Sequence, residues 1–312
     1  MAGQISLRPV SAAEWQIIVL SWNGRNDTLA CLESLRHIDR DDVRIICVDN
    51  GSTDGSANAV RERFPEVVLI EAGENLGYAG GNNLGLRDAL EHGSRWMMLV
   101  NNDATVAADV IDGFEEAIDA RPKAGILAGK VFRADEPTVL SFAGQRVSTL
   151  LGYSGRPRGH GRPDGKRYAQ VVDSGRAIGA LMAISREAVE VVGLLDERLF
   201  AYVEDVDWAL RVRAAGYQVV VAPRARAWHR VSASTGGAAS THTLYYGARN
   251  TVAVLERHRP LGPVATRLRR AAILSSFALH ALMGPRRGAR LAAVRSGFAD
   301  ARAGRLGIRP PG

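Results

Sequence analysis

The feature that most constrains the fold is a regular alternation of short apolar runs with helix-like segments, in which each run ends in small polar residues. Residues 15–20, 43–48 and 96–100 form three such runs. Their composition is typical of strands that are buried on both faces of a sheet. Strands that alternate with helices at this spacing predict an α/β fold, with a doubly wound, mostly parallel central sheet and helices on both faces.

The polar residues at the ends of these runs form the first candidate site. Parallel strands bring their carboxyl ends to one edge of the sheet, where α/β proteins bind ligands. Asp49 follows the second run. It can accept hydrogen bonds from a base or a ribose, or form an Asx turn with Gly51. Asp103 follows the third run. It can hold a divalent cation bound to a diphosphate, or cap the helix expected at 107–120.

A second candidate site is the acidic stretch at 204–207 (EDVD). Helical spacing predicts that Glu204 and Asp207 share a face while Asp205 points elsewhere. These acids can supply one general base and its supports, although acids in a first helical turn are also favoured by the helix dipole alone. His229, in the segment that follows a late strand expected at 218–222, is either a structural histidine or a metal ligand.

The basic residues are concentrated at the end of the chain. The formal net charge is +7, but residues 262–312 contain ten arginines and one acidic residue, so the remainder is slightly acidic. A basic tail on a nearly neutral body argues against nucleic acid as a partner. The apolar stripes beside arginines in this tail are typical of helices packed on the body or in a homodimer, or of an interfacial contact with anionic lipid.

The chain is expected to divide into a leader (1–14), a main domain (15–260) and a basic helical extension (261–312). Within the main domain, residues 152–170 are rich in glycine, proline and cations and lack an apolar period. We expect a mobile loop there, either a plain insertion or a lid whose cations meet an anionic substrate.

Several protein classes lose support from the sequence. The glycine-rich segment 77–85 lacks the Gly-Lys-Ser/Thr ending of a P-loop, and residues 21–24 after the first strand are not the GxGxxG of dinucleotide-binding folds. Cys31 and Cys47 are expected to be buried thiols rather than a disulfide. Because no N-terminal secretion signal is visible, we expect a cytoplasmic protein, with peripheral contact to the inner face of the cell membrane as an alternative.

Five blocks of the sequence, in order, resemble the family 2 glycosyltransferases of the GT-A fold. They are IIVLSWNGRNDTLACLESL (17–35), ICVDNGSTDGS (46–56), NLGYAGGNNLGL (75–86), LVNNDATV (99–106) and GALMAISREAVEVVGLLDERLFAYVEDVDWALRVRAAGY (179–217). The resemblance covers about residues 15–260. It is closest in style to bacterial rhamnosyltransferase-like and galactofuranosyltransferase-like members.

The resemblance implies an inverting transfer of a sugar from dTDP-rhamnose or a UDP-sugar to an acceptor hydroxyl, in the synthesis of cell-envelope polysaccharide or glycoconjugates. Mg²⁺ or Mn²⁺ would be the cofactor. The acceptor would be a carbohydrate, a lipid-linked sugar or a small molecule. Residues from about 15 to 130 would bind the nucleotide-sugar, and those from about 171 to 260 the acceptor.

Individual residues receive roles from the same resemblance. The nucleotide would be bound by Ser21, Asn23, Asp49, Asn75, Gly77, Asn83, Asn102 and Asp103. Asp103 and His229 would hold the metal ion. Asp205 would be the catalytic base, with Glu204 and Asp207 as supporting acids, and Trp208 would wall the acceptor site.

The sequence departs from the family pattern at one position. Asn101 stands where the first acid of the DXD motif is usual, which leaves one carboxylate for the metal ion. Two other functions stay open: a sugar-phosphate nucleotidyltransferase, and a non-catalytic domain that binds carbohydrate or nucleotide. The first usually carries a basic, glycine-rich loop after the first strand, which is absent here. A non-catalytic domain would have no need to retain Asp49, Asp103, Asp205 and His229 together.

Overall fold

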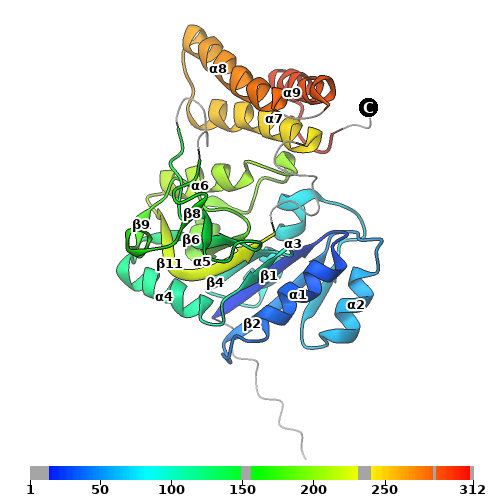
Figure 1. The fold of residues 1–312 in the computed structure, drawn as a ribbon, viewed down its shortest axis with the longest axis vertical. Helices are drawn as coiled ribbons and strands as arrows, with labels where there is room; N and C mark the ends of the chain where they lie inside the picture. Colours follow the sequence, from blue (N-terminus) through cyan, green and yellow to red (C-terminus); the bar gives the residue numbers. More distant parts are fainter. Residues whose placement is uncertain (1–13, 149–155, 231–239, 284–285, 310–312) are drawn as a thin grey trace, which may run out of the picture.

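The structure is a computed structural model that describes residues 14–148, 156–230, 240–283 and 286–309 (Figure 1). The strands are β1 (Trp15–Ser21), β2 (Val43–Asp49), β3 (Val68–Glu71), β4 (Trp96–Asn101), β5 (Ala104–Val106), β6 (Ala124–Arg133), β7 (Val139–Phe142), β8 (Arg162–Pro163), β9 (Val172–Asp173), β10 (Leu181–Ser185) and β11 (Gln218–His229). The helices are α1 (Arg25–Leu35), α2 (Ser56–Arg63), α3 (Gly77–Glu91), α4 (Val110–Ala120), α5 (Arg186–Val192), α6 (Glu204–Ala214), α7 (Thr241–His258), α8 (Pro263–Leu282) and α9 (Arg287–Arg302), with short 3₁₀ turns η1 (Lys166–Tyr168) and η2 (Glu197–Leu199).

The described strands form one mixed sheet whose main path runs β3-β2-β1-β4-β10-β6-β11-β5. Strands β1 to β4 are parallel, as are β6 and β11, while β10 is inserted antiparallel between β4 and β6. Successive strands are added in one direction from β1 through β2 to β3. The chain then crosses back past β1 to form β4 on its other side. Right-handed crossovers therefore place α1 and α2 on one face and α3 on the other. The predicted α/β fold is confirmed.

The apolar runs become central strands because burial on both faces removes their side chains from water. Ile17, Ile18, Met97 and Met98 are fully buried in the main core. Burial of one such side chain stabilises the fold by about 1.5–3 kcal/mol. Each run ends where small polar residues emerge at the edge of the sheet.

The register of the strands brings these polar ends together. Ser21 pairs with Asp49 and Leu20 pairs with Asn101, so β1, β2 and β4 finish at the same edge. The late strand extends well beyond the apolar run that ends at residue 222. It runs antiparallel to β5 and places His229 opposite Ala104. One edge of the sheet thus collects residues from distant parts of the chain.

Part of the segment 152–170, expected to be a mobile loop, packs against the body. Strand β8 pairs with β7, and Lys130 forms an ion pair with Asp164 at 2.8 Å. Tyr168 is buried between two arginine guanidinium groups. These contacts hold residues 156–170 in place, which the composition of the segment did not predict; residues 152–155 lie outside the described residues.

Helices α7, α8 and α9 pack on one another above the sheet (Figure 1). The Tyr245 hydroxyl of α7 donates to Asp300 of α9 at 2.5 Å. At Gly297 a Cβ atom would lie 2.3 Å from the Tyr245 carbonyl oxygen, so the two helices approach closely only because this residue is glycine. The predicted boundary at residue 260 falls between helices of this bundle and stays a prediction. Among the described residues, no helix is long and apolar enough to cross a membrane.

Candidate active site

A cavity of about 680 Å³ opens between the carboxyl ends of β1, β2 and β4 and the helices α6, α7 and α8. Its wall at the sheet edge is polar and includes Asn101 and Asp103. Its far end, beside α8, includes the apolar side chains of Ile273 and Phe277. Concave sites with a few convergent polar groups are where proteins bind small molecules.

Asp103 and His229 meet in the wall of this cavity. Strand pairing of β5 with β11 aligns them, and His229 Nε2 lies 2.9 Å from Asp103 Oδ1. The two side chains are only 8% and 14% exposed, and both line the cavity. The two residues expected to be metal ligands are therefore brought together, although they lie 126 positions apart.

The chemistry of this pair fits a divalent cation. Imidazole nitrogen with carboxylate oxygen suits Mn²⁺ better than Mg²⁺, which prefers oxygen ligands alone. Asn101 adds an amide group to the same wall. No group of three His, Cys, Asp or Glu side chains within the described ranges could hold a metal ion. A cation here would need further oxygen ligands, of the kind that a diphosphate supplies.

Asp49 has one occupied and one unoccupied carboxylate oxygen. Its Oδ2 atom accepts a hydrogen bond from the backbone N–H of Ser52 at 3.0 Å, which closes a turn after β2. Its Oδ1 atom is buried and has no hydrogen-bond partner among the described residues. Buried acceptors are normally paired, so this atom is suited to a donor on a bound ligand. Asp49 thus forms the turn through Oδ2 and leaves Oδ1 for a hydrogen-bond donor on a ligand, so its two predicted roles use different oxygen atoms.

Asn50 is a site residue that the sequence did not single out. Its side chain donates to Asn75 Oδ1 and to the Gly77 carbonyl, both at 3.1 Å, and all three residues line the cavity. Gly77 has φ +73°, and a Cβ atom there would lie 2.4 Å from the Phe200 carbonyl oxygen. Only glycine fits both conditions. The start of α3 is therefore fixed against the ends of β2 and of the 200–203 turn.

Three residues expected to bind nucleotide form hydrogen bonds within the protein. Ser21 Oγ lies 2.8 Å from Thr28 Oγ1, and Thr28 Oγ1 also accepts from the side chain of Asn102 at 3.0 Å. Of these residues, Asn102 still borders the cavity. Asn23 is exposed and accepts a hydrogen bond from the backbone N–H of Thr53 at 2.8 Å. These contacts hold the loops after β1 and β4 in place. A sequence pattern cannot distinguish a residue that holds a loop in place from one that binds a ligand.

Asn83 also points away from the cavity. Its side chain exchanges two hydrogen bonds with the backbone of Leu195, at 2.9 and 3.1 Å, and donates a third to Glu197 at 2.9 Å. All its hydrogen bonds are therefore made within the protein. In the structure, Asn83 joins α3 to the segment before η2.

Glu204 and Asp205 begin α6 and both line the cavity. Three non-glycine residues in the preceding turn, at 200, 202 and 203, have positive φ, a conformation that costs free energy. Asn250 of α7 offsets this cost, because its amide donates to three carbonyl oxygens between residues 199 and 202 at 2.8–2.9 Å. This strained, well-bonded turn presents the two acids to the cavity.

Arg176 is the partner of Asp205, and sequence reasoning missed it. Its Nη1 atom lies 2.9 Å from Asp205 Oδ2, and its Nε atom donates to Gln145 Oε1 at 2.9 Å. Arg176 precedes β10 in a segment without a local motif, so no pattern in the sequence identifies it. Its contact with Asp205 depends on the tertiary fold alone.

Burial and charge separate the two acids. Burial and the neighbouring Asp205 raise the pKa of Glu204 from its ordinary 4.5 to about 8. Burial raises the pKa of Asp205 as well, but the Arg176 cation opposes that rise. Asp205 is therefore the acid of the pair that ionises more readily, and Glu204 keeps its proton near neutral pH.

Several polar atoms around the cavity have no partner within the described chain. Tyr78 Oη, Glu204 Oε2, His242 Nδ1 and Thr251 Oγ1 are buried and unpaired, and all four residues line the cavity. A buried polar atom without a hydrogen bond costs about 1–3 kcal/mol. A ligand rich in hydroxyl groups would satisfy such atoms, because each hydroxyl both donates and accepts.

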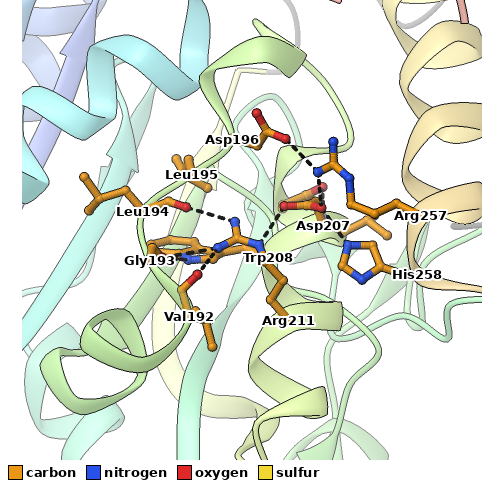
Figure 2. A network of polar contacts seen from close by, with 12 residues as sticks. Val192, Gly193, Leu194, Leu195, Asp196, Asp207, Trp208, Arg211, Arg257 and His258 are labelled. Atoms are coloured by element: carbon orange, nitrogen blue, oxygen red, sulfur yellow. Dashed lines mark hydrogen bonds and ion pairs between the residues drawn. The ribbon is translucent and has the colours of Figure 1, made fainter. Parts of the chain in front are cut away.

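Asp207 does not belong to the cavity, and the expectation that it shares a face with Glu204 is wrong. It is fully buried, and its carboxylate accepts from Arg211 Nε at 2.8 Å and from His258 Nε2 at 2.7 Å (Figure 2). Glu204 lines the cavity from the first position of α6, whereas Asp207 is held by the side chains of Arg211 and His258. Trp208 is also fully buried and donates to the Gly193 carbonyl, so it does not wall the cavity.

Comparison with known proteins decides the family. Residues 16–192 match the model of the family described as glycosyl transferase family 2. The chain belongs to glycosyl transferase family 2. As a member of this family it is a glycosyltransferase, which agrees with the resemblance seen in the sequence.

Individual relatives of this glycosyltransferase add detail. An N-acetylglucosaminyl-diphospho-decaprenol L-rhamnosyltransferase from Mycobacterium tuberculosis is 30% identical over 233 residues, which cover 69% of this chain and 76% of the relative. The dTDP-rhamnosyl transferase RfbF of Shigella flexneri is 23% identical over 253 residues, covering 78% and 81%. The family and these names agree with a rhamnosyltransferase-like protein of polysaccharide synthesis.

Solved structures show the same fold at low identity. A mannosyltransferase from Pyrobaculum calidifontis, in complex with GDP-Man and Mn²⁺, has a TM-score of 0.54 at 20% identity, covering 95% of this glycosyltransferase and 76% of that chain. S. aureus TarS in complex with UDP-GlcNAc has a TM-score of 0.57 at 13% identity, covering 92% and 81%. Both are GT-A glycosyltransferases, so the expected fold type is confirmed.

The expected role of Asp205 as catalytic base, together with its contact with Arg176, predicts a change in the pH dependence of transfer. Without the cation the pKa of Asp205 rises, so Arg176→Gln is expected to move the acid limb of the pH–rate profile upward by about one to three pH units. Arg176→Lys keeps the positive charge, so its pH–rate profile should lie between those of the wild type and Arg176→Gln. Initial rates across the pH range test this. A uniformly lower rate with an unchanged profile would mean that Arg176 is only structural.

The raised pKa of Glu204 predicts a cost in stability at alkaline pH. The unfolded chain loses this proton above pH 4.5 but the folded chain holds it to about pH 8, so the contribution is fully present below pH 4.5 and is lost as pH rises through 8. Glu204→Gln cannot ionise. It is expected to exceed the wild type by about 2–4 kcal/mol at pH 8 and by little at pH 5. Urea unfolding at both pH values measures the difference in stability. Glu62→Gln, at an exposed position, is the control. An equal gain in stability at pH 5 and pH 8 would contradict the prediction.

Proposed function

We propose that this glycosyltransferase moves a sugar from a nucleoside diphosphate donor to an acceptor hydroxyl with inversion at the anomeric carbon. The observation that carries the proposal is one cavity lined both by the Asp103–His229 pair and by the Glu204–Asp205 pair. The first pair suits a metal-bound diphosphate, and the second supplies an acid–base group. The names of the relatives favour dTDP-rhamnose as the donor, with UDP-sugars as the alternative.

Asp205 is the proposed base. An acceptor hydroxyl is a poor nucleophile at neutral pH, and a carboxylate within hydrogen-bond reach removes its proton as attack begins. Arg176 holds the Asp205 carboxylate in place and opposes the rise in its pKa that burial causes. The neutral carboxyl of Glu204 leaves the site with one charged base rather than two repelling carboxylates.

The leaving group is the nucleoside diphosphate. Asp103 and His229 would hold a divalent cation, Mn²⁺ or Mg²⁺, which supplies charge stabilisation to the departing diphosphate. Asp49 Oδ1 would accept a hydrogen bond from the nucleoside, either from its base or from its ribose. Asn50, Asn75 and Gly77 would form the adjoining wall.

Inversion follows from the acids in the cavity. Among the described residues, Asp103, Glu204 and Asp205 are the acids that line it. With Asp103 committed to the cation and Glu204 protonated, no further carboxylate is available to form a covalent sugar intermediate. Direct displacement by the activated hydroxyl therefore accounts for the arrangement.

The acceptor is proposed to be a sugar carried on a lipid. The far end of the cavity, beside α8, combines the apolar side chains of Ile273 and Phe277 with Ser276 and His280. A hydroxyl-rich sugar would satisfy the unpaired atoms of Tyr78, His242 and Thr251. The name of the mycobacterial relative specifies such a lipid-linked acceptor. A soluble glycan or small molecule is the alternative.

Turnover with a defined set of substrates tests the function. The purified protein would be incubated with dTDP-rhamnose, UDP-glucose or UDP-N-acetylglucosamine, with a lipid-linked N-acetylglucosamine acceptor, and with or without Mn²⁺. We expect Mn²⁺-dependent transfer from one donor class, with the product anomer inverted by NMR. A product that retains the anomeric configuration would contradict the mechanism. Conversion of the nucleotide sugar and added pyrophosphate into nucleoside triphosphate and sugar 1-phosphate would favour a nucleotidyltransferase.

A further inference from the structure

The outer face of α8 is apolar and has no partner within the described part of the chain. It consists of residues spaced three or four apart, all of them exposed: Val264, Leu268, Ala271, Ser275, Leu279 and Leu282. We call this face the outer stripe of α8. Val264, Leu268 and Leu279 are 70%, 66% and 61% exposed, which is unusual for large apolar side chains gathered on one helix.

Positive charge borders the outer stripe. Arg267 is exposed beside its first half, and Arg286 and Arg287 are exposed just beyond its end. None of the three forms an ion pair with a described residue. By contrast, Arg270 is neutralised by Glu256 at 2.6 Å. The sequence has no acidic residue between positions 262 and 299, so nothing local offsets this charge.

A lipid surface with anionic head groups matches both properties. An amphipathic helix of this kind lies in the membrane interface, with its apolar side chains between the head groups and its cations on phosphates. The stripe spans about 27 Å along the helix axis at 1.5 Å per residue. We propose that the outer stripe of α8 docks this protein on an anionic phospholipid bilayer. The helix lies on the surface rather than crossing it.

A second copy of the chain fits the stripe less well. Antiparallel pairing of two stripes would place Arg267 of one copy near the end of the other copy's stripe, beyond which Arg286 and Arg287 lie. With no acidic residue nearby, like charges would face each other at both ends of the contact. Anionic lipid removes this repulsion, so charge complementarity selects the bilayer.

Docking in this way orients the cavity. The opposite face of α8 carries Ile273, Ser276 and Phe277, which line the far end of the cavity. One helix therefore separates the cavity from the proposed membrane surface. Docking by the outer stripe would hold the apolar end of the cavity next to the bilayer. The proposal does not depend on the proposed donor, acceptor or mechanism.

Vesicle sedimentation with the full chain tests the proposal. Vesicles of phosphatidylcholine alone would be compared with vesicles that also contain phosphatidylglycerol. Leu268→Glu/Leu279→Glu removes the apolar contact, and Arg286→Glu/Arg287→Glu removes charge. Val191→Glu is the matched control, because Val191 on α5 is 64% exposed and lies outside the stripe. All replaced side chains are exposed, and circular dichroism would confirm that each variant folds.

We expect binding to the anionic vesicles, reduced about tenfold or more by either double variant and by high salt, and unchanged in Val191→Glu. Equal binding to both kinds of vesicle, or equal binding by all variants, would overturn the proposal. A failure to bind any vesicle would also overturn the proposal. That outcome includes the case in which the outer stripe forms a dimer and Leu268→Glu/Leu279→Glu dissociates the dimer. None of these outcomes bears on the transfer reaction, which is measured separately.

Discussion

Asp205→Asn is expected to lower the rate of sugar transfer by about 10²–10⁴-fold, the range for loss of a general base. The amide has the same shape as the carboxylate but only one oxygen, so it can keep the hydrogen bond from the backbone N–H of Val206 or the one from Arg176 at Oδ2, but not both. It cannot take a proton at neutral pH. The loss should therefore appear in kcat, measured with saturating donor and acceptor.

Nucleotide binding is the internal control for this variant. Asp205 begins α6, whereas Asp49, Asn50 and Asp103 at the strand ends form the proposed nucleotide side, so donor affinity should stay within a few-fold of the wild type. Asp119→Asn, an exposed change of the same kind on α4, should keep full activity. A variant Asp205→Asn that keeps more than about a tenth of the rate would remove Asp205 from the role of base. A wild type that transfers no sugar would instead favour the non-catalytic alternative.

Asp207→Asn is expected to destabilise the fold by about 3–5 kcal/mol without acting on the chemistry directly. The carboxylate is fully buried and joins α6 to His258 and Arg257 of α7 as well as to Arg211 (Figure 2). Removing its charge leaves Arg211 and His258 without this anion, whereas Arg257 keeps its ion pair with Asp196 at 2.7 Å. Urea unfolding at pH 7 measures the loss, and Asp119→Asn should change stability by less than about 0.5 kcal/mol.

The pH dependence of this network has the opposite sign to that of Glu204. Although burial alone would raise the pKa of Asp207, hydrogen bonding by His258 and the charge of Arg211 lower it below its ordinary 3.8. Its contribution is therefore present above about pH 4 and is lost as pH falls below that value. The difference between wild type and Asp207→Asn should shrink in acid. A difference that stays constant down to pH 2 would show that the charge of Asp207 is not what stabilises the network.

The local features of the chain were predictable because they follow from composition over a few residues. Apolar runs that end in small polar residues predicted the central strands and the edge at which Asp49 and Asp103 emerge. Burial decides these elements, and burial leaves a periodic trace in the sequence.

The relations between distant residues were not predictable in the same way. Pairing of β5 with β11 brings His229 to Asp103, and only the family resemblance anticipated that contact. Nothing local indicates that Arg176 reaches Asp205, or that Asn50 binds the start of α3. The spacing of Glu204 and Asp207 predicted a common helix face. In the structure Glu204 lines the cavity from the first position of α6, whereas Asp207 is bound by other side chains of α6 and α7.

The most direct test of the central claim is nucleotide binding at the Asp103–His229 end of the cavity. Thermal unfolding would be followed with dTDP, UDP and their sugar conjugates, with and without Mn²⁺, for the wild type and Asp103→Ala. A ligand at about 100 times its Kd stabilises the native state by about 2.7 kcal/mol, enough to raise the Tm by several degrees. The account predicts a shift with one nucleotide class that needs Mn²⁺ and is lost in Asp103→Ala. No shift with any nucleotide, or the same shift in both proteins, would contradict it.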